Sequence, residues 1–243
     1  MNKVALVTGG ARRLGKDISI KLAGLGYDIV LNYNESSKSV LEETLSLLKS
    51  LNVNTTAVKC DVSNVPEIRK MFKTVYQKYK RLDVLVNNAA IFRHTEFLET
   101  SEKDFDRFIN TNLKSVFFCS QEAAKIMTGN SEMPGRIINI ASLGGIENWT
   151  GYIPYSLSKT GVIKFTELAA KKLAPEILVN AIAPGTVLID NDENDNVNQG
   201  DTKKYPMKRF AKAEDLTSLL KYLTEENNYI TGQTFIVDGG KSL

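Results

Sequence analysis

Short apolar runs alternate with longer amphipathic stretches along the chain. In the longer stretches, apolar residues recur every three or four positions, as at Val40, Leu41, Leu45 and Leu48, which is the period of a half-buried helix. The apolar runs are rich in β-branched residues and lie at residues 4–7, 28–31, 55–59, 84–86, 137–140, 179–182 and 234–237. This alternation predicts a parallel sheet covered by helices on both faces. Right-handed crossovers then make it a doubly wound α/β fold with about seven central strands.

No internal repeat and no linker interrupts this pattern, so we expect one domain over residues 1–243. One segment, residues 190–205, departs from it, because Val197 is its only apolar aliphatic residue. We expect a mobile substrate loop over residues 186–210, since the segment follows the sixth strand. Its clustered acids invite a calcium site, but their spacing is not that of an EF-hand, and a solvated loop is the better interpretation.

Charge and composition exclude several classes of protein. The net charge is only +3, which is too small to indicate nucleic acid or a membrane surface as partner. No apolar run approaches the roughly 20 residues of a membrane span. The first strand is predicted to begin near Lys3, so we expect no signal peptide. Cys60 and Cys119 are expected to be reduced thiols in the cytoplasm. With His94, expected at the surface, as the single histidine, the sequence favours neither a metal site nor a Ser-His-Asp triad.

The stretch "TGGARRLG" at residues 8–15 directly follows the first predicted strand. A glycine-rich turn between a strand and a helix is typical of a Rossmann site, where Gly9 allows unusual backbone angles. A helix beginning near Arg13 would present its free N–H groups to a pyrophosphate. An ordinary helix N-terminus is the alternative interpretation of this stretch taken by itself.

The second strand is followed by Asn32, Tyr33 and Asn34, where NAD-binding folds usually carry an acid for the ribose hydroxyl. A carboxylate there would repel a 2′-phosphate, so its absence favours NADP(H). Arg12 can pair with that phosphate through its planar guanidinium, and Ser36 can donate a hydroxyl. Arg12 as a solvated surface residue is the alternative.

Tyr155 and Lys159 lie four residues apart in a predicted helix and therefore share one face. A free tyrosine has a pKa near 10, and a neighbouring ammonium is expected to lower that pKa so that the phenol can give a proton to a carbonyl oxygen. Ser142 follows the fifth strand, at the edge where ligands bind in open α/β sheets. Asn112 falls inside a long helical pattern, where a polar residue usually faces solvent.

Together these motifs resemble the classical short-chain dehydrogenase/reductase family across essentially the whole chain. The resemblance implies a catalytic tetrad of Asn112, Ser142, Tyr155 and Lys159, in which Asn112 takes part in a proton relay and Lys159 also holds the nicotinamide ribose. It also implies the cofactor-binding residues Gly9, Arg12, Arg13, Leu14, Gly15, Ser36, Asp61, Val62, Asn88, Tyr155, Lys159, Pro184 and Gly185, with Asp61 and Val62 near the adenine.

Two departures from the family pattern bear on the substrate. Arg13 replaces the usual middle glycine, and "NNAA" at residues 87–90, followed by Phe92, replaces the usual "NNAG". Both features are similar to the pteridine reductase branch, where the arginine and the aromatic bind a pterin. The stretches "LAPEILVNAIAPG" and "DGGKSL" are similar to bacterial dihydromonapterin reductases of that branch. Ser142, however, stands where pteridine reductases commonly carry Asp, and it restores the tetrad of 3-oxoacyl-carrier-protein reductases.

We therefore expect an NADPH-dependent reductase of a small carbonyl substrate, contacted by Arg13, Phe92, Ser142 and Tyr155. Reduction of a pterin C=N bond is the alternative, and a catalytically silent NADP-binding or sensing protein is an alternative from another class. For Phe92, plain packing at the cleft rim is also open. An enoyl reductase is disfavoured, because that branch separates its tyrosine and lysine by more residues.

Two predicted helical segments, residues 101–127 and 155–173, carry apolar residues over much of their surface, including Phe105, Phe117 and Leu168. One sheet face cannot bury all of them. The family resemblance implies that these helices pair with their copies across twofold axes, so we expect a homo-oligomer, either a tetramer or a dimer.

Overall fold

The computed structural model describes residues 2–128, 133–189 and 199–243. Within this part of the chain, seven parallel strands form one sheet in the order β3-β2-β1-β4-β5-β6-β9. The strands are β1 (Val4–Val7), β2 (Asp28–Tyr33), β3 (Thr55–Lys59), β4 (Val84–Asn87), β5 (Gly135–Ile140), β6 (Ile177–Pro184) and β9 (Thr234–Val237). The predicted parallel, doubly wound sheet is confirmed, and each predicted run lies within one of these strands.

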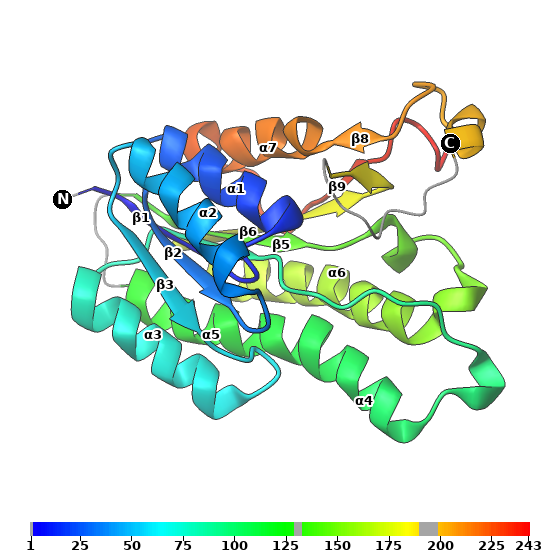
Figure 1. Cartoon of the computed structure of the whole chain (residues 1–243), viewed down its shortest axis with the longest axis horizontal. Coiled ribbons are helices and arrows are strands. Elements are labelled where there is room, and N and C mark those ends of the chain that lie inside the picture. The colour runs from blue at the N-terminus through cyan, green and yellow to red at the C-terminus, as the bar shows by residue number, and fades with distance from the viewer. Residues whose placement is uncertain (1, 129–132, 190–198) are drawn as a thin grey trace.

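Helices cover both faces of the sheet (Figure 1). The α-helices are α1 (Arg13–Gly24), α2 (Lys38–Ser50), α3 (Val65–Tyr79), α4 (Glu102–Ile109), α5 (Ser115–Met127), α6 (Ile153–Leu173) and α7 (Ala213–Lys221). In Figure 1, α1, α2 and α7 lie above the sheet, and α3 to α6 lie below it. None of the helices in the described ranges combines the length and hydrophobicity that a bilayer crossing requires.

The strands are apolar on both faces because both faces are covered. Successive residues of β1 alternate between two cores. Val4 and Leu6 pack between the sheet and helices α3 and α5, whereas Ala5 and Val7 pack between the sheet and helices α1 and α7. Alternate residues of each strand therefore face opposite sides of the sheet, where they pack against the apolar faces of the helices. This packing forms two separate hydrophobic layers.

The strand order reverses between β1 and β4, which are neighbours in the sheet although β2 and β3 separate them in sequence. Their crossovers leave on opposite faces, which opens a crevice beyond their carboxyl ends. There the Thr8 backbone N–H donates to Val86 O at 3.0 Å, and the Thr8 hydroxyl accepts from the backbone N–H of Asn88 at 2.9 Å. The glycine-rich loop at residues 8–15 and the end of β4 are thus joined at the place where ligands bind in this fold class.

Two segments differ from the expected pattern. The helical pattern over residues 101–127 contains a π-turn at Asn110–Lys114, between α4 and α5. The expected loop over residues 186–210 holds a short strand, β7 (Val187–Leu188), which pairs with β8 (Ala211–Lys212) just beyond the loop. It also holds a 3-10 helix at Gln199–Lys204, whereas residues 190–198, where most of the acids cluster, lie outside the described residues.

Candidate active site

The glycine-rich loop packs closely against the end of β4. Gly9 has a φ of +63°, and a Cβ added to Gly15 would lie 2.1 Å from the carbonyl oxygen of Gly9. Arg13 opens α1 with a φ of +52°, in the left-handed region that favours glycine. The sequence therefore places an arginine where backbone geometry suits the glycine that the family usually carries.

Two asparagine side chains hold this loop in place. Asn32 Oδ1 accepts from the backbone N–H of Gly9 at 3.1 Å, while Asn32 Nδ2 donates to Cys60 O at 2.9 Å. Asn88 Nδ2 donates to Thr8 O at 2.9 Å and to Gly9 O at 3.3 Å. Asn32 was not among the predicted site residues. A buried polar residue at the end of an apolar strand is the signal that could have pointed to it.

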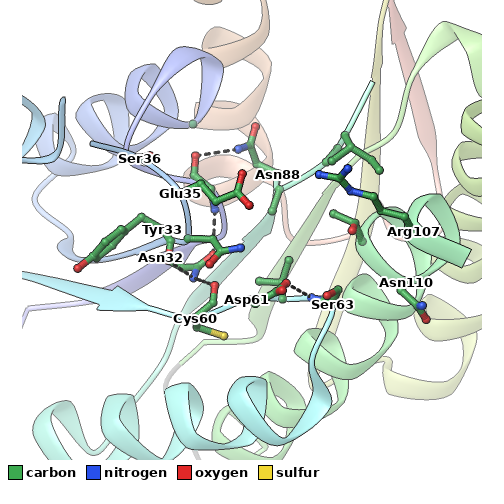
Figure 2. Close-up of a pocket in the computed structure, with 18 of the residues that line it drawn as sticks. Asn32, Tyr33, Glu35, Ser36, Cys60, Asp61, Ser63, Asn88, Arg107 and Asn110 are labelled. Carbon is green, nitrogen blue, oxygen red and sulfur yellow. Dashed lines mark hydrogen bonds between the residues drawn. The ribbon is translucent and has the colours of Figure 1, made fainter. Parts of the chain in front are cut away.

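A cavity of about 820 Å³ opens over this loop (Figure 2). It is lined by nine of the predicted cofactor residues: Gly9, Arg12, Arg13, Leu14, Gly15, Ser36, Asp61, Val62 and Asn88. Its volume suits a cofactor. Gly9 and Gly15 form its floor, and because they carry no side chain, a pyrophosphate could approach the backbone at the start of α1. The residues present therefore fit a dinucleotide. Tyr155, Lys159, Pro184 and Gly185 are not part of this lining.

The cavity has further walls that were not predicted. Glu35 lines it beside Ser36, and α4 contributes Lys103, Asp106 and Arg107. Figure 2 shows the Arg107 side chain extending from α4 across the cavity toward Asn88. No local motif marks these α4 residues, because only the three-dimensional fold brings α4 next to the ends of β3 and β4.

Tyr155 and Lys159 both lie in the first turns of α6 and are buried. Lys159 Nζ donates to Ile140 O at 2.7 Å, which fixes the ammonium at the end of β5 and 5.8 Å from the centre of the Tyr155 ring. Ser142 follows β5, and its hydroxyl accepts from the backbone N–H of Gly144 at 3.0 Å and hydrogen-bonds to the Tyr155 phenol. Three of the four predicted catalytic residues thus meet at one end of β5.

The expectation that Lys159 lowers the pKa of Tyr155 is wrong for the chain without ligands. Burial raises the pKa of Tyr155 to about 12, although the hydrogen bond from Ser142 acts in the opposite direction. Burial also lowers the pKa of Lys159 to about 8. The phenol is therefore protonated at neutral pH, which is the form that a proton donor needs.

Asn112 lies in the π-turn and is fully buried, whereas a mid-helix polar residue was expected to face solvent. Its amide pairs with both backbone groups of Ile91, accepting at 2.8 Å and donating at 3.0 Å, and it donates to the Ser158 hydroxyl at 3.1 Å. The Ser158 hydroxyl in turn donates to Tyr155 O at 2.6 Å. Asn112 therefore joins the segment after β4 to the helix turn that carries Tyr155. Ser158 was not predicted.

Phe92 borders the catalytic phenol. Its ring stacks on Tyr152 at a centroid distance of 4.7 Å and meets Tyr155 edge-on at 4.8 Å. It nevertheless remains 57% exposed. The two interpretations of Phe92, packing and substrate contact, are therefore compatible. His94 is exposed, as expected, and its ring contacts Tyr152 edge-on.

Pro184 and Gly185 lie at the carboxyl end of β6, next to the end of β5 that carries Ser142. The backbone N–H of Gly185 donates to Val237 O at 3.0 Å, and an added Cβ at Gly185 would approach Asp238 Cβ to 3.1 Å. In the described ranges, no group of three or more His, Cys, Asp or Glu side chains could hold a metal ion.

Comparisons with known proteins agree with this geometry. A family model described as enoyl-(acyl carrier protein) reductase matches residues 9–242. The chain is 38% identical over 241 residues to a 3-oxoacyl-[acyl-carrier-protein] reductase from Synechocystis sp., covering 98% of this chain and 96% of the relative. It is 37% identical over 244 residues to the FabG 3-oxoacyl-[acyl-carrier-protein] reductase from Staphylococcus epidermidis, covering 99% of each protein.

Solved structures are similar over the same extent. An acetoin dehydrogenase from Enterobacter cloacae superposes with a TM-score of 0.90 at 31% identity, covering 100% of this chain and 97% of that one. A short chain dehydrogenase from Burkholderia cenocepacia J2315, solved in complex with NADP, gives a TM-score of 0.90 at 28% identity, with 99% and 98% covered. Fold, site and relatives define an α/β oxidoreductase of a class that uses nicotinamide cofactors. The chain belongs to the short-chain dehydrogenase/reductase family.

Proposed function

We propose that the chain reduces a 3-oxoacyl-type or similar ketone with NADPH, using Tyr155 as the proton donor. The observation that carries the proposal is the buried Tyr155 phenol, hydrogen-bonded to Ser142, with the Lys159 ammonium fixed 5.8 Å from its ring. The relatives that are 37% and 38% identical over nearly the whole chain carry the name of this activity, which supports the substrate class.

NADPH supplies a hydride to the carbonyl carbon when it is bound. Tyr155 gives its phenolic proton to the carbonyl oxygen, and the Ser142 hydroxyl stabilises the negative charge that develops on that oxygen. Lys159 stabilises the phenolate left on Tyr155 and would hold the nicotinamide ribose of a bound cofactor. Asn112 holds the Tyr155 turn through Ser158 and takes part in the relay that returns a proton to the site.

The preference for NADPH rests on Arg12 and Ser36, which share the cavity at the end of β2 where no acid occupies the usual position. Glu35 lies in the same wall, and its carboxylate would repel a 2′-phosphate. The guanidinium of Arg12 is therefore the group that makes a 2′-phosphate favourable there. Asp61 and Val62 line the same cavity and would border the adenine, and Asn88 holds the glycine-rich loop that would lie beneath the cofactor.

A panel of NADPH oxidation assays tests the substrate class. We expect turnover with an acetoacetyl thioester and none with a crotonyl thioester, because Tyr155 and Lys159 are four residues apart, unlike the pair in enoyl reductases. If only the crotonyl thioester is turned over, the proposal that the chain reduces a ketone is rejected. Binding of NADPH without turnover of any panel member would favour a silent, nucleotide-sensing protein.

A pteridine reductase is the second candidate, favoured by the exposed face of Phe92 beside Tyr155 and by Arg13 in the glycine-rich loop. A flat pterin ring would stack on Phe92. If this function holds, Phe92→Ala raises the KM for dihydrobiopterin and spares the KM for the thioester. If the ketone is the substrate, dihydrobiopterin is not reduced.

We also propose a homo-oligomer, either a tetramer or a dimer, in a reducing cytoplasm. Within the chain, α4 to α6 bury Phe108, Val116 and Val162, but leave exposed apolar side chains at Phe105, Phe117, Leu157 and Leu168. Pairing of these helices with their copies would cover them. Cys60 and Cys119 are free and buried thiols, which supports the reducing setting. A monomer in light scattering at micromolar concentration would reject the oligomer.

A further inference from the structure

The C-terminal residues form a tight turn directly after β9. The Asp238 carboxylate accepts from the backbone N–H groups of Gly240 at 2.9 Å and Ser242 at 2.8 Å. Gly239 and Gly240 have φ angles of +65° and +83°, which other residues rarely adopt. The two glycines reverse the chain and direct Lys241 back toward the segment that follows β5.

Lys241 meets that segment at Glu147. Its Nζ lies 2.8 Å from Glu147 Oε2, and the same oxygen accepts from the indole N–H of Trp149 at 2.6 Å. Lys241 Nζ also lies 5.4 Å from the centre of the Trp149 ring, within range of a cation–π contact. The side chains of Lys241 and Glu147 are only 23% and 27% exposed, so solvent screens this pair less than a surface ion pair. Burial raises the pKa of Glu147, but the hydrogen bonds from Lys241 and Trp149 outweigh it, and the net shift of that pKa is downward.

Trp149 connects this ion pair to the catalytic phenol. Its ring contacts Tyr152 at a centroid distance of 6.0 Å and Phe92 at 6.4 Å, and Phe92 meets Tyr155. On its other side Trp149 packs on Gly144, where an added Cβ would lie 2.6 Å from the indole ring. Phe92, Trp149 and Tyr152 thus form an aromatic wall beside the reacting group, and Trp149 is its link to Lys241.

The same turn also touches the segment that leads out of the loop after β6. The backbone N–H of Met207 donates to Gly239 O at 3.2 Å, and a Cβ added to Gly240 would approach Pro206 to 2.9 Å. The Tyr205 hydroxyl lies 2.9 Å from that of Thr186, at the start of this loop. The C-terminal turn is therefore packed between the two segments that border the catalytic end of the sheet.

We propose that Lys241 is a positioning residue for substrate binding, which through Glu147 fixes Trp149 and with it the aromatic wall beside Tyr155. The inference rests on the proposed ketone reduction, in which this wall receives the apolar part of the substrate next to the carbonyl. Lys241 does not touch the reacting atoms, so its effect falls on substrate binding and not on the chemical step.

The variant Lys241→Met tests this proposal, and Lys241→Arg is the conservative variant. The matched control is Lys221→Met, which removes a lysine whose partner, Glu226, is exposed. For Lys241→Met we expect a KM for the acetoacetyl thioester raised about five- to tenfold with kcat within about twofold of wild type, the signature of lost binding. Lys241→Arg retains the charge and restores the KM, and Lys221→Met changes neither constant.

Trp149 is the only tryptophan in the chain, so its fluorescence reports on the wall without substrate or cofactor. We expect acrylamide to quench Trp149 more strongly in Lys241→Met than in wild type, Lys241→Arg or Lys221→Met. Wild-type KM and wild-type quenching in Lys241→Met, even with a lower melting temperature, would overturn the proposal. If wild type reduces no ketone, the proposed function fails by itself, and the quenching alone then decides whether Lys241 positions Trp149.

Discussion

Two parts of the candidate site hold their side chains in different ways: the cofactor half, where the cavity opens at the ends of β1 to β4, and the catalytic half around Tyr155, at the ends of β5 and β6. In the cofactor half, backbone and glycines form the floor, and Arg12 and Arg13 are exposed. In the catalytic half, Tyr155 and Lys159 are buried and hydrogen-bonded into the fold. Removal of an exposed group costs mainly ligand affinity, whereas a buried group serves ligand and fold together. The two halves should therefore respond differently to substitution.

The largest effect should come from Tyr155→Phe. This change removes the proposed proton donor but keeps the ring that packs against Phe92, so the fold is retained. General acid catalysis is typically worth about 10²–10⁴-fold, and we expect turnover to fall by that factor while the NADPH dissociation constant changes little. Steady-state assays, cofactor titration and a thermal melt check the three parts. Turnover within a few-fold of wild type would reject Tyr155 as the donor.

In the cofactor half, Arg12→Ala should separate the two nicotinamide cofactors. A charge-assisted contact to the 2′-phosphate is worth roughly 1.5–3 kcal/mol, so the dissociation constant for NADPH should rise about ten- to a hundredfold. The constant for NADH, which lacks that phosphate, should stay nearly unchanged. Arg69→Ala, an exposed arginine on α3 outside the cavity, is the control in the same titrations. Equal losses for both cofactors would contradict the assignment.

The buried lysine predicts the pH dependence of the catalytic half. Because burial lowers the pKa of Lys159 to about 8, its charged form is present below that pH and is lost above it. The pKa of Tyr155, about 12, lies too high to contribute. We therefore expect kcat/KM for NADPH, which reports on the free enzyme, to be level below about pH 8 and to fall about tenfold per unit above it. A profile that stays level to about pH 10 would contradict the lowered pKa, because a lysine with its ordinary pKa keeps its charge to that pH.

The smallest effect concerns the backbone of the glycine-rich loop. Arg13 has a φ of +52°, so Arg13→Gly relieves a left-handed conformation and should raise the free energy of unfolding by about 1 kcal/mol. Arg12→Gly is the matched control, because Arg12 has a φ of −153° and gains nothing from glycine. Denaturant unfolding of both variants checks the difference. A destabilised Arg13→Gly protein would mean that the contacts of its side chain outweigh the backbone conformation.

The features that the sequence predicts rest on residues close together in the chain, and the features that it misses join distant parts of the chain. Gly9, Gly15 and the seven strands follow from local pattern, since loop and strand are continuous in the chain. By contrast, Lys241 and Glu147 are 94 residues apart, and no periodicity brings them together. The strand pair β7–β8 has only two residues in each strand, too few to show alternation.

Burial was the other quantity that local pattern could not supply. Asn112 occupies an ordinary position in a helical pattern, and only its contacts with Ile91 and Ser158 show that it is internal. The pKa of Tyr155 depends on the same quantity: spacing along α6 indicated a neighbouring lysine, but the desolvation of both groups decides the direction of the shift. The family resemblance thus led to the proposed tetrad, and packing determines the ionisation of Tyr155 and Lys159.

The π-turn at Asn110–Lys114 has a consequence for how this site tolerates change in chain length. A π-turn accommodates one extra residue in a helix, and each residue of an α-helix turns the chain by about 100°. Loss of one residue there would allow α4 and α5 to join as one regular helix, and it would rotate Asn112 away from Ile91 and Ser158. The number of residues in this turn therefore sets how α4 and α5 are rotated relative to each other. Replacement of the exposed Lys114 keeps that rotation, whereas deletion of a single residue changes it.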